Sequence, residues 1–320
     1  MMKMALERLT LSVCAAVLLG GTMVTGTVLA ADDSDPPLDE YISATAPPKF
    51  DTPEQAVDAF KQTAGSGDFD KLAALLGLDA AKAKASDGAT DAYADIQAGV
   101  KQKVVLEDQD GGKMLEIGNQ LWPLPFPLVK GDDGKWSFDT YAGLEEIADR
   151  RVGENEISTI DTMRNYVDAQ EDYASEDRDE DGVLEYAQKL ISSEGKHDGL
   201  YWPSEQGDGD ESPAGAGLVD GNALAKAKAG LGYNGYRYRI LTGQGDNVAG
   251  GKFDYIINGN MIAGFGLVAW PVKYGITGVQ TFVINKSGIL YEADLGDDTS
   301  AVADKIRTFN PGDTWKVVPE

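Results

Sequence analysis

The only cysteine of the chain, Cys14, lies inside an N-terminal segment that has the pattern of an export signal. Lys3 and Arg8 give this segment a positive start, and a glycine-interrupted apolar run follows and ends at the small residue Ala30. This pattern is typical of a secretory signal peptide, which we expect to span residues 1–30 and to be removed on export. The mature chain then has no cysteine, so it must fold on hydrophobic cores without disulfides and without thiol chemistry.

Two alternatives to cleavage would keep this segment attached to a membrane. An uncleaved anchor would use the same apolar run as a membrane span, but the run contains glycines and ends at a cleavage pattern. Lipid attachment at Cys14 would need a small residue before it, and Val13 is not small. We therefore expect a periplasmic or secreted protein with no stable membrane insertion after cleavage.

Acidic residues dominate the charge of the chain. There are 53 acidic and 28 basic residues, a formal net charge of −25. Loss of the signal peptide removes Lys3, Arg8 and Glu7 and leaves the balance strongly negative. A negative field repels nucleic acids and anionic membranes and attracts cations, so nucleic acid is excluded as a partner. We expect an unidentified protein or small ligand of the cell envelope instead.

The chain is long enough for about two domains. Residues 31–50 are rich in proline and acids and are predicted to be a flexible leader. Residues 51–141 begin with helices, the first capped by Thr52, and continue as antiparallel hairpins, the first turning at Asp110-Gly111-Gly112. Helices followed by a curling sheet resemble the cone-shaped domains of the nuclear-transport-factor-2-like class.

Residues 142–320 are predicted to hold a long helix and a second antiparallel sheet. The helix has an apolar stripe that includes Ile157 and Met163, with a break near Gly153. A further helix is expected from Val183 to Leu190. Alternation in the segment 236–240 predicts a strand with one buried face. A helix on such a sheet resembles the globular half of type IV pilins, so the fold class is α+β.

Longer stretches of the second half give a closer resemblance. They are Tyr166-Val167-Asp168-Ala169-Gln170, Asp181-Gly182-Val183-Leu184-Glu185-Tyr186-Ala187-Gln188, Asp198-Gly199-Leu200-Tyr201-Trp202-Pro203 and Gly264-Phe265-Gly266-Leu267-Val268-Ala269-Trp270-Pro271. The chain resembles, over nearly all of its mature length, the bacterial family catalogued as domain of unknown function 2950. The resemblance implies export and a shared fold, and it implies no activity.

The sharpest candidate site is an acidic segment with alternating aspartates. Asp177, Asp179 and Asp181 precede a glycine, an arrangement that wraps oxygen ligands around Ca²⁺. Glu185 occupies a position where calcium loops tolerate an acid, and Gln188 stands where they use a bidentate glutamate, which predicts weaker binding. The alternative is a solvated loop whose acids cap the helix expected from Val183.

Other side chains that could carry chemistry point to no catalytic set. His197 is the single histidine, and no nucleophile motif, phosphate-binding loop or zinc-ligand spacing accompanies it, so we interpret it as a turn residue. Aromatic residues could line a groove for a sugar or peptide, although core packing explains them as well. They are Tyr201, Trp202, Tyr233, Tyr236, Tyr238 and Trp270.

Three functions follow as hypotheses. The first is a non-catalytic binding or scaffold module, stabilised by calcium. The second is a hydrolase that uses paired carboxylates in a pocket of the first module. The third is an accessory component of an export or surface assembly.

Overall fold

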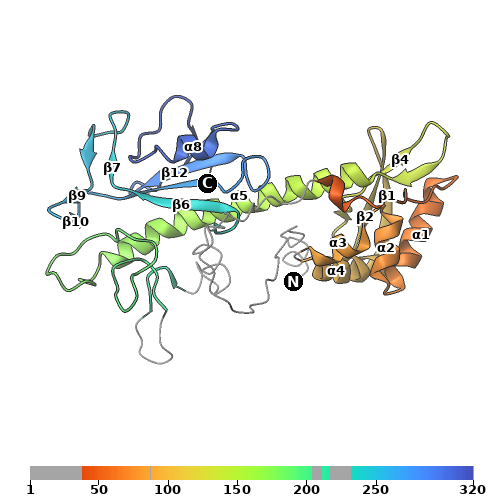
Figure 1. The fold of residues 1–320 in the computed structure, drawn as a ribbon, viewed down its shortest axis with the longest axis horizontal. Helices are drawn as coiled ribbons and strands as arrows, with labels where there is room; N and C mark the ends of the chain where they lie inside the picture. Colours follow the sequence, from red (N-terminus) through yellow and green to blue (C-terminus); the bar gives the residue numbers. More distant parts are fainter. Residues whose placement is uncertain (1–37, 87, 204–210, 216–231, 320) are drawn as a thin grey trace, which may run out of the picture. The chain divides into compact units, whose positions relative to one another are not determined.

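A computed structural model describes residues 38–86, 88–203, 211–215 and 232–319. The expected signal peptide, residues 31–37 of the expected leader and much of the surface loop expected at residues 204–222 therefore lie outside the described residues. The chain divides into two compact units, one ending at Arg151 and the other starting at Val152 (Figure 1). Helices and antiparallel sheets occur in both, which confirms the predicted α+β class.

The first unit opens with helices. They are η2 Leu38–Tyr41, α1 Pro53–Gly65, α2 Phe69–Leu75, α3 Ala80–Ala85 and α4 Ala89–Gln102. The predicted cap of α1 is confirmed, because the hydroxyl of Thr52 accepts the N–H of Gln55 at 3.4 Å. Asp68 caps α2 in the same way, accepting the N–H of Lys71 at 3.2 Å. Such caps satisfy backbone donors that have no partner within the helix.

The first sheet is antiparallel and has the order β1-β2-β4-β5, with β3 paired to β2. Its strands are β1 Val104–Gln109, β2 Gly112–Ile117, β3 Trp122–Pro123, β4 Leu128–Lys130 and β5 Trp136–Phe138. The predicted hairpin at Asp110-Gly111-Gly112 is present, with Gln109 paired to Gly112, and a second hairpin pairs Lys130 with Trp136. Phe60 of α1 packs on Phe138 of β5 in the core, their ring centroids 6.0 Å apart.

Helix α5, Thr140–Tyr173, runs without interruption for 34 residues. The predicted break at Gly153 is therefore wrong. The predicted stripe is wrong at Ile157, which is 63% exposed. The buried face of this part of the helix instead includes two polar residues, Thr159 and Gln170. Thr159 accepts a hydrogen bond from Tyr238, so hydrogen bonding rather than hydrophobicity fills part of the face.

The second sheet has the order β14-β13-β12-β11-β6. Its strands are β6 Tyr236–Leu241, β11 Gly266–Pro271, β12 Gln280–Asn285, β13 Tyr291–Asp294 and β14 Lys316–Val317. Figure 1 shows α5 along one side of this sheet and α8, Thr299–Ala303, on the other. Met163 of α5 joins the cluster on the first side, and Ala303 of α8 joins the cluster on the second. Tyr236, Tyr238 and Ile240 pack on the first side, as the alternation predicts, but α8 and Phe309 cover the second side as well.

Two short hairpins extend the second unit. They consist of β7 Gly243–Gln244 with β8 Phe253–Asp254, and β9 Ile256–Ile257 with β10 Asn260–Met261. Asn258 and Gly259 form the tight turn between β9 and β10, with φ of 53° and 102°. Positive φ at both central positions matches the right-handed twist of the strands, and Asn-Gly adopts it at low cost.

The helix predicted from Val183 to Leu190 is wrong. This segment is irregular, and several of its backbone groups bond to distant partners. The N–H of Tyr186 donates to the carbonyl of Met261 at 2.8 Å. The buried amide of Gln170 accepts the N–H of Ala187 at 2.8 Å and donates to its carbonyl at 2.9 Å. Tertiary pairing overrides the local preference here.

In the part of the chain that the structure describes, no helix has both the length and the apolarity that a membrane span requires.

Candidate functional site

The segment Asp177–Gly182, which we name the acidic loop, folds back on itself directly after α5. Both carboxylate oxygens of Asp177 accept backbone N–H groups, from Asp181 at 3.2 Å and from Gly182 at 2.9 Å. Glu180 and Gly182 have positive φ, 61° and 88°, which closes the turn. One carboxylate oxygen from each of Asp177, Asp179 and Asp181 lies within 4.8 Å of the others, and all three residues are exposed. The spacing in the sequence thus predicts which acids converge.

Glu185 lies beside this group but is buried. Its Oε2 accepts the N–H of Met261 at 2.7 Å. Burial raises the pKa of Glu185, the N–H of Met261 opposes this shift, and the carboxylate of Asp179 adds to it. Glu185 is therefore a fourth carboxylate in electrostatic contact with the acidic loop.

Gln188 does not join the convergent acids. Its Nε2 donates to the carbonyl of Gly259 at 2.6 Å and to Glu185 at 3.3 Å. The side chain that replaces the bidentate glutamate of a calcium loop thus fastens the segment to the turn before β10.

Asn260 is a neighbour of the site that sequence reasoning missed. Its Nδ2 donates to Oδ2 of Asp181 at 2.6 Å. The turn Asn258-Gly259 predicts a hairpin at this point. Nothing local, however, tells which distant loop the hairpin will face, because the two residues are 79 positions apart.

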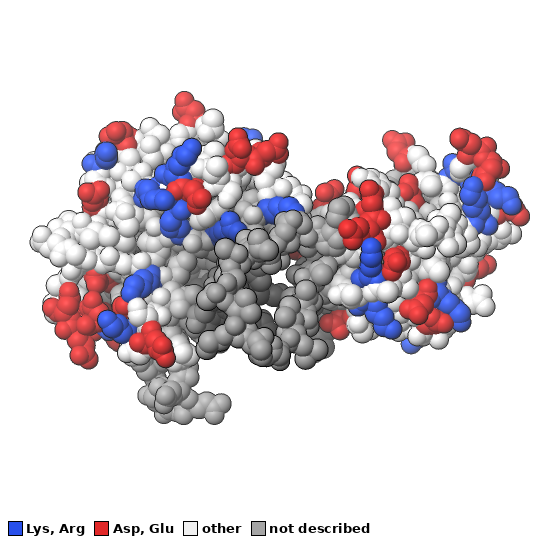
Figure 2. Space-filling view, viewed as in Figure 1, with Lys and Arg blue, Asp and Glu red and all other residues white. Residues whose placement is uncertain are grey.

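The surroundings make negative charge costly in the acidic loop. Helix α5 ends at Tyr173, so its carbonyl end, which carries partial negative charge, faces the acids that follow. Arg178 is a basic residue within the loop, but it forms ion pairs with two acids that precede the loop, Asp172 at 3.8 Å and Glu176 at 3.6 Å. Figure 2 shows acidic side chains gathered at the end of the second unit that Figure 1 assigns to the segment after α5.

The pKa of Tyr173 reflects the negative charge around the acidic loop. Burial raises its pKa to about 12, with further contributions from the carboxylates of Asp179, Glu185 and Asp198. Several oxygens with unbalanced negative charge are the environment in which a hard divalent cation is favoured.

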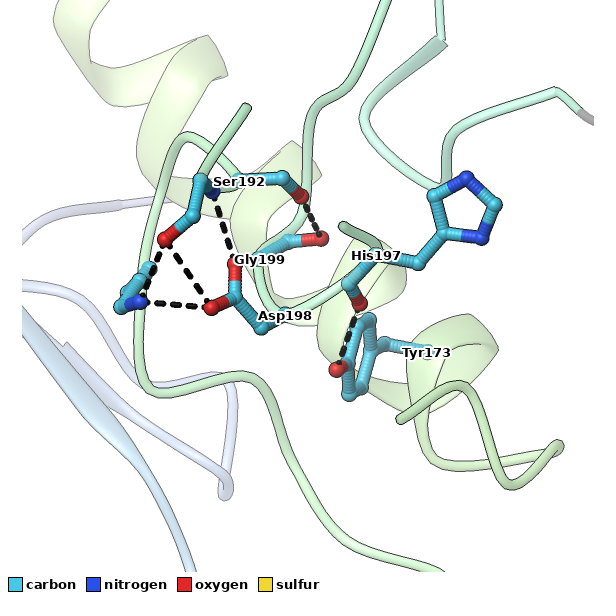
Figure 3. A network of polar contacts seen from close by, with 7 residues as sticks. Tyr173, Ser192, His197, Asp198 and Gly199 are labelled. Atoms are coloured by element: carbon cyan, nitrogen blue, oxygen red, sulfur yellow. Dashed lines mark hydrogen bonds and ion pairs between the residues drawn. The ribbon is translucent and has the colours of Figure 1, made fainter. Parts of the chain in front are cut away.

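His197 lies in the loop that follows the turn at Glu194-Gly195. Its carbonyl accepts the hydroxyl of Tyr173 at 2.8 Å, and its ring stacks on Trp202 with the centroids 4.4 Å apart. Figure 3 shows the imidazole pointing away from the carboxylate of Asp198. The carbonyl of His197 and its stacked ring thus hold this loop against Tyr173 and Trp202.

Ser193, Lys189 and Asp198 form a second polar group in the same turn. Lys189 donates to Ser193 at 2.8 Å and to Asp198 at 2.6 Å, and the serine hydroxyl donates to Asp198 at 3.0 Å. A base that activates serine must accept its proton, whereas this lysine is an ammonium paired with a carboxylate. The group therefore stabilises the turn.

The aromatic residues singled out in the sequence belong largely to the core. Trp202 and Tyr236 are buried in the cluster that also contains α5, and Trp270 is buried on the other face of the sheet. Gly266 permits close strand packing, because a Cβ there would lie 3.1 Å from the carbonyl of Ile284.

The first unit contains a cavity of about 90 Å³. Fifteen residues line it, from η2, α2, α3, α4, the start of α5 and the adjoining loops. None of these lining residues is charged, so the paired carboxylates that a hydrolase would need are not found in this cavity.

A family profile described as a protein of unknown function, DUF2950, matches residues 48–318. No curated protein and no solved structure matches the chain significantly.

Proposed function

The chain belongs to the DUF2950 family of proteins of unknown function, as its sequence predicted, and we propose that it is a non-catalytic binding or scaffold module of the cell envelope whose second unit binds one Ca²⁺ at the acidic loop. The observation that carries this proposal is the convergence of three carboxylate oxygens within 4.8 Å. The expected localisation, periplasmic or secreted, adds an environment in which calcium is available.

The alternative explanation of the acids weakens once the local structure is known. In that explanation the acidic loop caps a helix from Val183 and gains from its dipole. The segment that follows the loop is not helical, so the acids gain no such stabilisation. They instead follow the carbonyl end of α5, where a bound cation would offset both the helix dipole and their mutual repulsion.

The affinity should be modest. Ca²⁺ prefers six to eight oxygen ligands, and the three aspartates would share the ion with water and with nearby oxygens. Gln188 supplies no bidentate carboxylate. We expect a dissociation constant on the order of 10⁻⁴ M, in the range of extracellular calcium modules.

Isothermal titration of the calcium-stripped full chain tests the proposal. Asp179→Asn keeps the shape of the side chain but removes one ligand charge, and should weaken binding at least tenfold. Asp110→Asn, in the hairpin turn of the first unit, removes the same charge far from the acidic loop in the sequence and should leave binding unchanged. Absence of heat with the unaltered chain, or equal affinities for the two variants, would contradict calcium binding at this loop.

The third hypothesis, a component of an export or surface assembly, has one observation in its favour. Leu184 and Ile262 are 59% and 44% exposed, and they flank the contact between Tyr186 and Met261. Exposed apolar side chains on adjoining segments favour a protein partner. A partner recovered from envelope extracts by the unaltered chain and lost with Leu184→Ser would support this role, and recovery of the same proteins by both would count against it.

A further inference from the structure

The chain contains two Asn-Gly pairs, Asn234-Gly235 and Asn258-Gly259. Both form tight turns with positive φ at both positions, 50° and 74° in the first pair and 53° and 102° in the second. Both asparagines are exposed. The two pairs are thus matched in sequence, in turn geometry and in access to water, and they differ in what surrounds the glycine.

Gly235 is held firmly by the rest of the second unit. A Cβ added there would lie 2.5 Å from Nδ2 of Asn155. The carbonyl of Gly235 accepts the N–H of Val272 at 2.9 Å. The next residue, Tyr236, is fully buried and begins a strand of the five-stranded sheet. Rotation of the peptide group before Gly235 would disturb all of these contacts.

Gly259 has open space around it. A Cβ added there would meet no atom within 4 Å. Its carbonyl is held by the exposed side chain of Gln188, and its N–H bonds to none of the residues that the structure describes. Strands β9 and β10, which this turn joins, have two residues each. So short a hairpin opens locally at low cost, and the peptide group before Gly259 can then rotate.

We propose that Asn258 is a modification site, at which the folded chain converts asparagine to isoaspartate and aspartate without an enzyme, whereas Asn234 is protected. The N–H of Gly259 loses its proton to base, and its nitrogen attacks Cγ of Asn258. The new N–Cγ bond closes a succinimide ring, and the side-chain amide leaves as ammonia. Water, the only other reactant, then opens the ring at either carbonyl. One opening gives aspartate, and the other gives isoaspartate, whose backbone runs through the side chain.

The conversion acts on the candidate site, because this turn is fastened to the acidic loop. Gly259 accepts a hydrogen bond from Gln188, and Asn260 donates one to Asp181, both at 2.6 Å. Isoaspartate adds a methylene group to the backbone, which disturbs the pairing of Ile257 with Asn260. Either product also adds negative charge beside acids that already repel one another. We therefore expect the turn to separate from the acidic loop.

Peptide mapping of the incubated full chain is the direct test. Mildly alkaline pH promotes loss of the glycine proton, and mass spectrometry with electron-transfer fragmentation distinguishes isoaspartate from aspartate. Trypsin places the two asparagines in separate peptides, residues 229–237 and 253–273. In the folded chain Asn258 should convert about tenfold faster than Asn234, because its turn opens at lower cost. In urea, where the surroundings are lost, the two should convert at similar rates.

Three outcomes count against the assignment. No conversion of Asn258 in the folded chain, or equal rates at Asn258 and Asn234, would overturn it. A difference in rate that persists in urea would show that the neighbouring sequence, and not the structure, selects the site.

Two variants test the consequence for the acidic loop. Asn258→Gly keeps a residue that adopts positive φ but removes the reactive amide, and Asn234→Gly does the same at the protected turn as the matched control. After incubation, hydrogen exchange in peptides that cover the acidic loop should be faster in the unaltered chain and in Asn234→Gly, and unchanged in Asn258→Gly. The same acceleration in Asn258→Gly, or none in a converted unaltered chain, would contradict this consequence. All of these measurements are made without calcium, so none depends on the calcium proposal.

Discussion

Asp198 shows how a single residue fixes the turn that follows the acidic loop. Its carboxylate accepts the ammonium of Lys189 and both the N–H and the hydroxyl of Ser193. Partial burial raises the pKa of Asp198, but these hydrogen bonds outweigh burial and lower it to about 2. The turn is thus tied together by a carboxylate that stays ionised.

This pKa predicts a specific loss of stability in acid. A carboxyl group that is more acidic in the folded state than in the unfolded state stabilises the protein above its unfolded pKa, about 3.9, and loses this contribution as the pH falls towards 2. Asp198→Asn should therefore cost about 1–2 kcal/mol at pH 7, after allowance for the half-exposed Lys189, and much less near pH 2.

Urea unfolding of both proteins at pH 7 and near pH 2 measures the difference, with Asp110→Asn as the control. An unchanged gap between Asp198→Asn and the unaltered chain at the two pH values would contradict the account of this turn.

Residues whose role depends on local spacing were predictable, and those whose role depends on tertiary contact were not. The alternation of Asp177, Asp179 and Asp181 with a following glycine identifies the convergent acids. Asn260 reaches Asp181 only because the β9–β10 hairpin packs there. Tyr93, which lines the cavity of the first unit, follows Ala89 by four positions and precedes Ile96 by three, a helical stripe that predicts a buried face but not a cavity in it.

At the scale of elements, α5 contains two glycines with opposite surroundings. A Cβ added at Gly153 would meet no atom within 4 Å, whereas one at Gly143 would lie 2.1 Å from the ring of Phe126. Gly153→Ala should stabilise the protein by about 0.5–1 kcal/mol, because alanine loses less backbone entropy in a helix. Gly143→Ala should destabilise it by about 1–3 kcal/mol through overpacking.

Thermal and denaturant unfolding of the two variants gives a matched comparison within one helix. Destabilisation by Gly153→Ala would indicate that the helix needs glycine at this position, as the expected break implied.

Elements with strong local signals were predicted well. Thr52 and Asp68 begin helices, and the Asp110-Gly111-Gly112 turn closes a hairpin, since each acts within a few residues. The segment Val183–Leu190 was assigned to a helix wrongly, because its backbone partners, Gln170 and Met261, are distant in sequence. The stripe of α5 was misplaced at Ile157 because Thr159 and Gln170 are buried through hydrogen bonds.

At the scale of the whole molecule, the chain consists of two units, each with its own hydrophobic core. Because the chain has no cysteine after Cys14, such cores were expected. The length of the chain also predicted about two domains. The sequence predicts a helix from Thr299 to Arg307, which the structure has as α8, Thr299–Ala303, but it does not reveal that this helix covers the second face of the second sheet. The cone-like and pilin-like resemblances of the two units stay predictions.

Both proposals concern the second unit alone. Calcium concerns the acidic loop, and the conversion of Asn258 concerns the turn fastened to that loop. The effect of calcium should therefore be local, which makes the central claim testable segment by segment.

Hydrogen exchange of the full chain, measured by mass spectrometry in millimolar Ca²⁺ and in EGTA, tests that claim most directly. Calcium should slow exchange in peptides that cover the acidic loop and the β9–β10 turn, leave peptides from residues 53–138 unchanged, and have no effect on Asp179→Asn. Identical exchange with and without calcium in the acidic loop, or the same protection in Asp179→Asn, would contradict it.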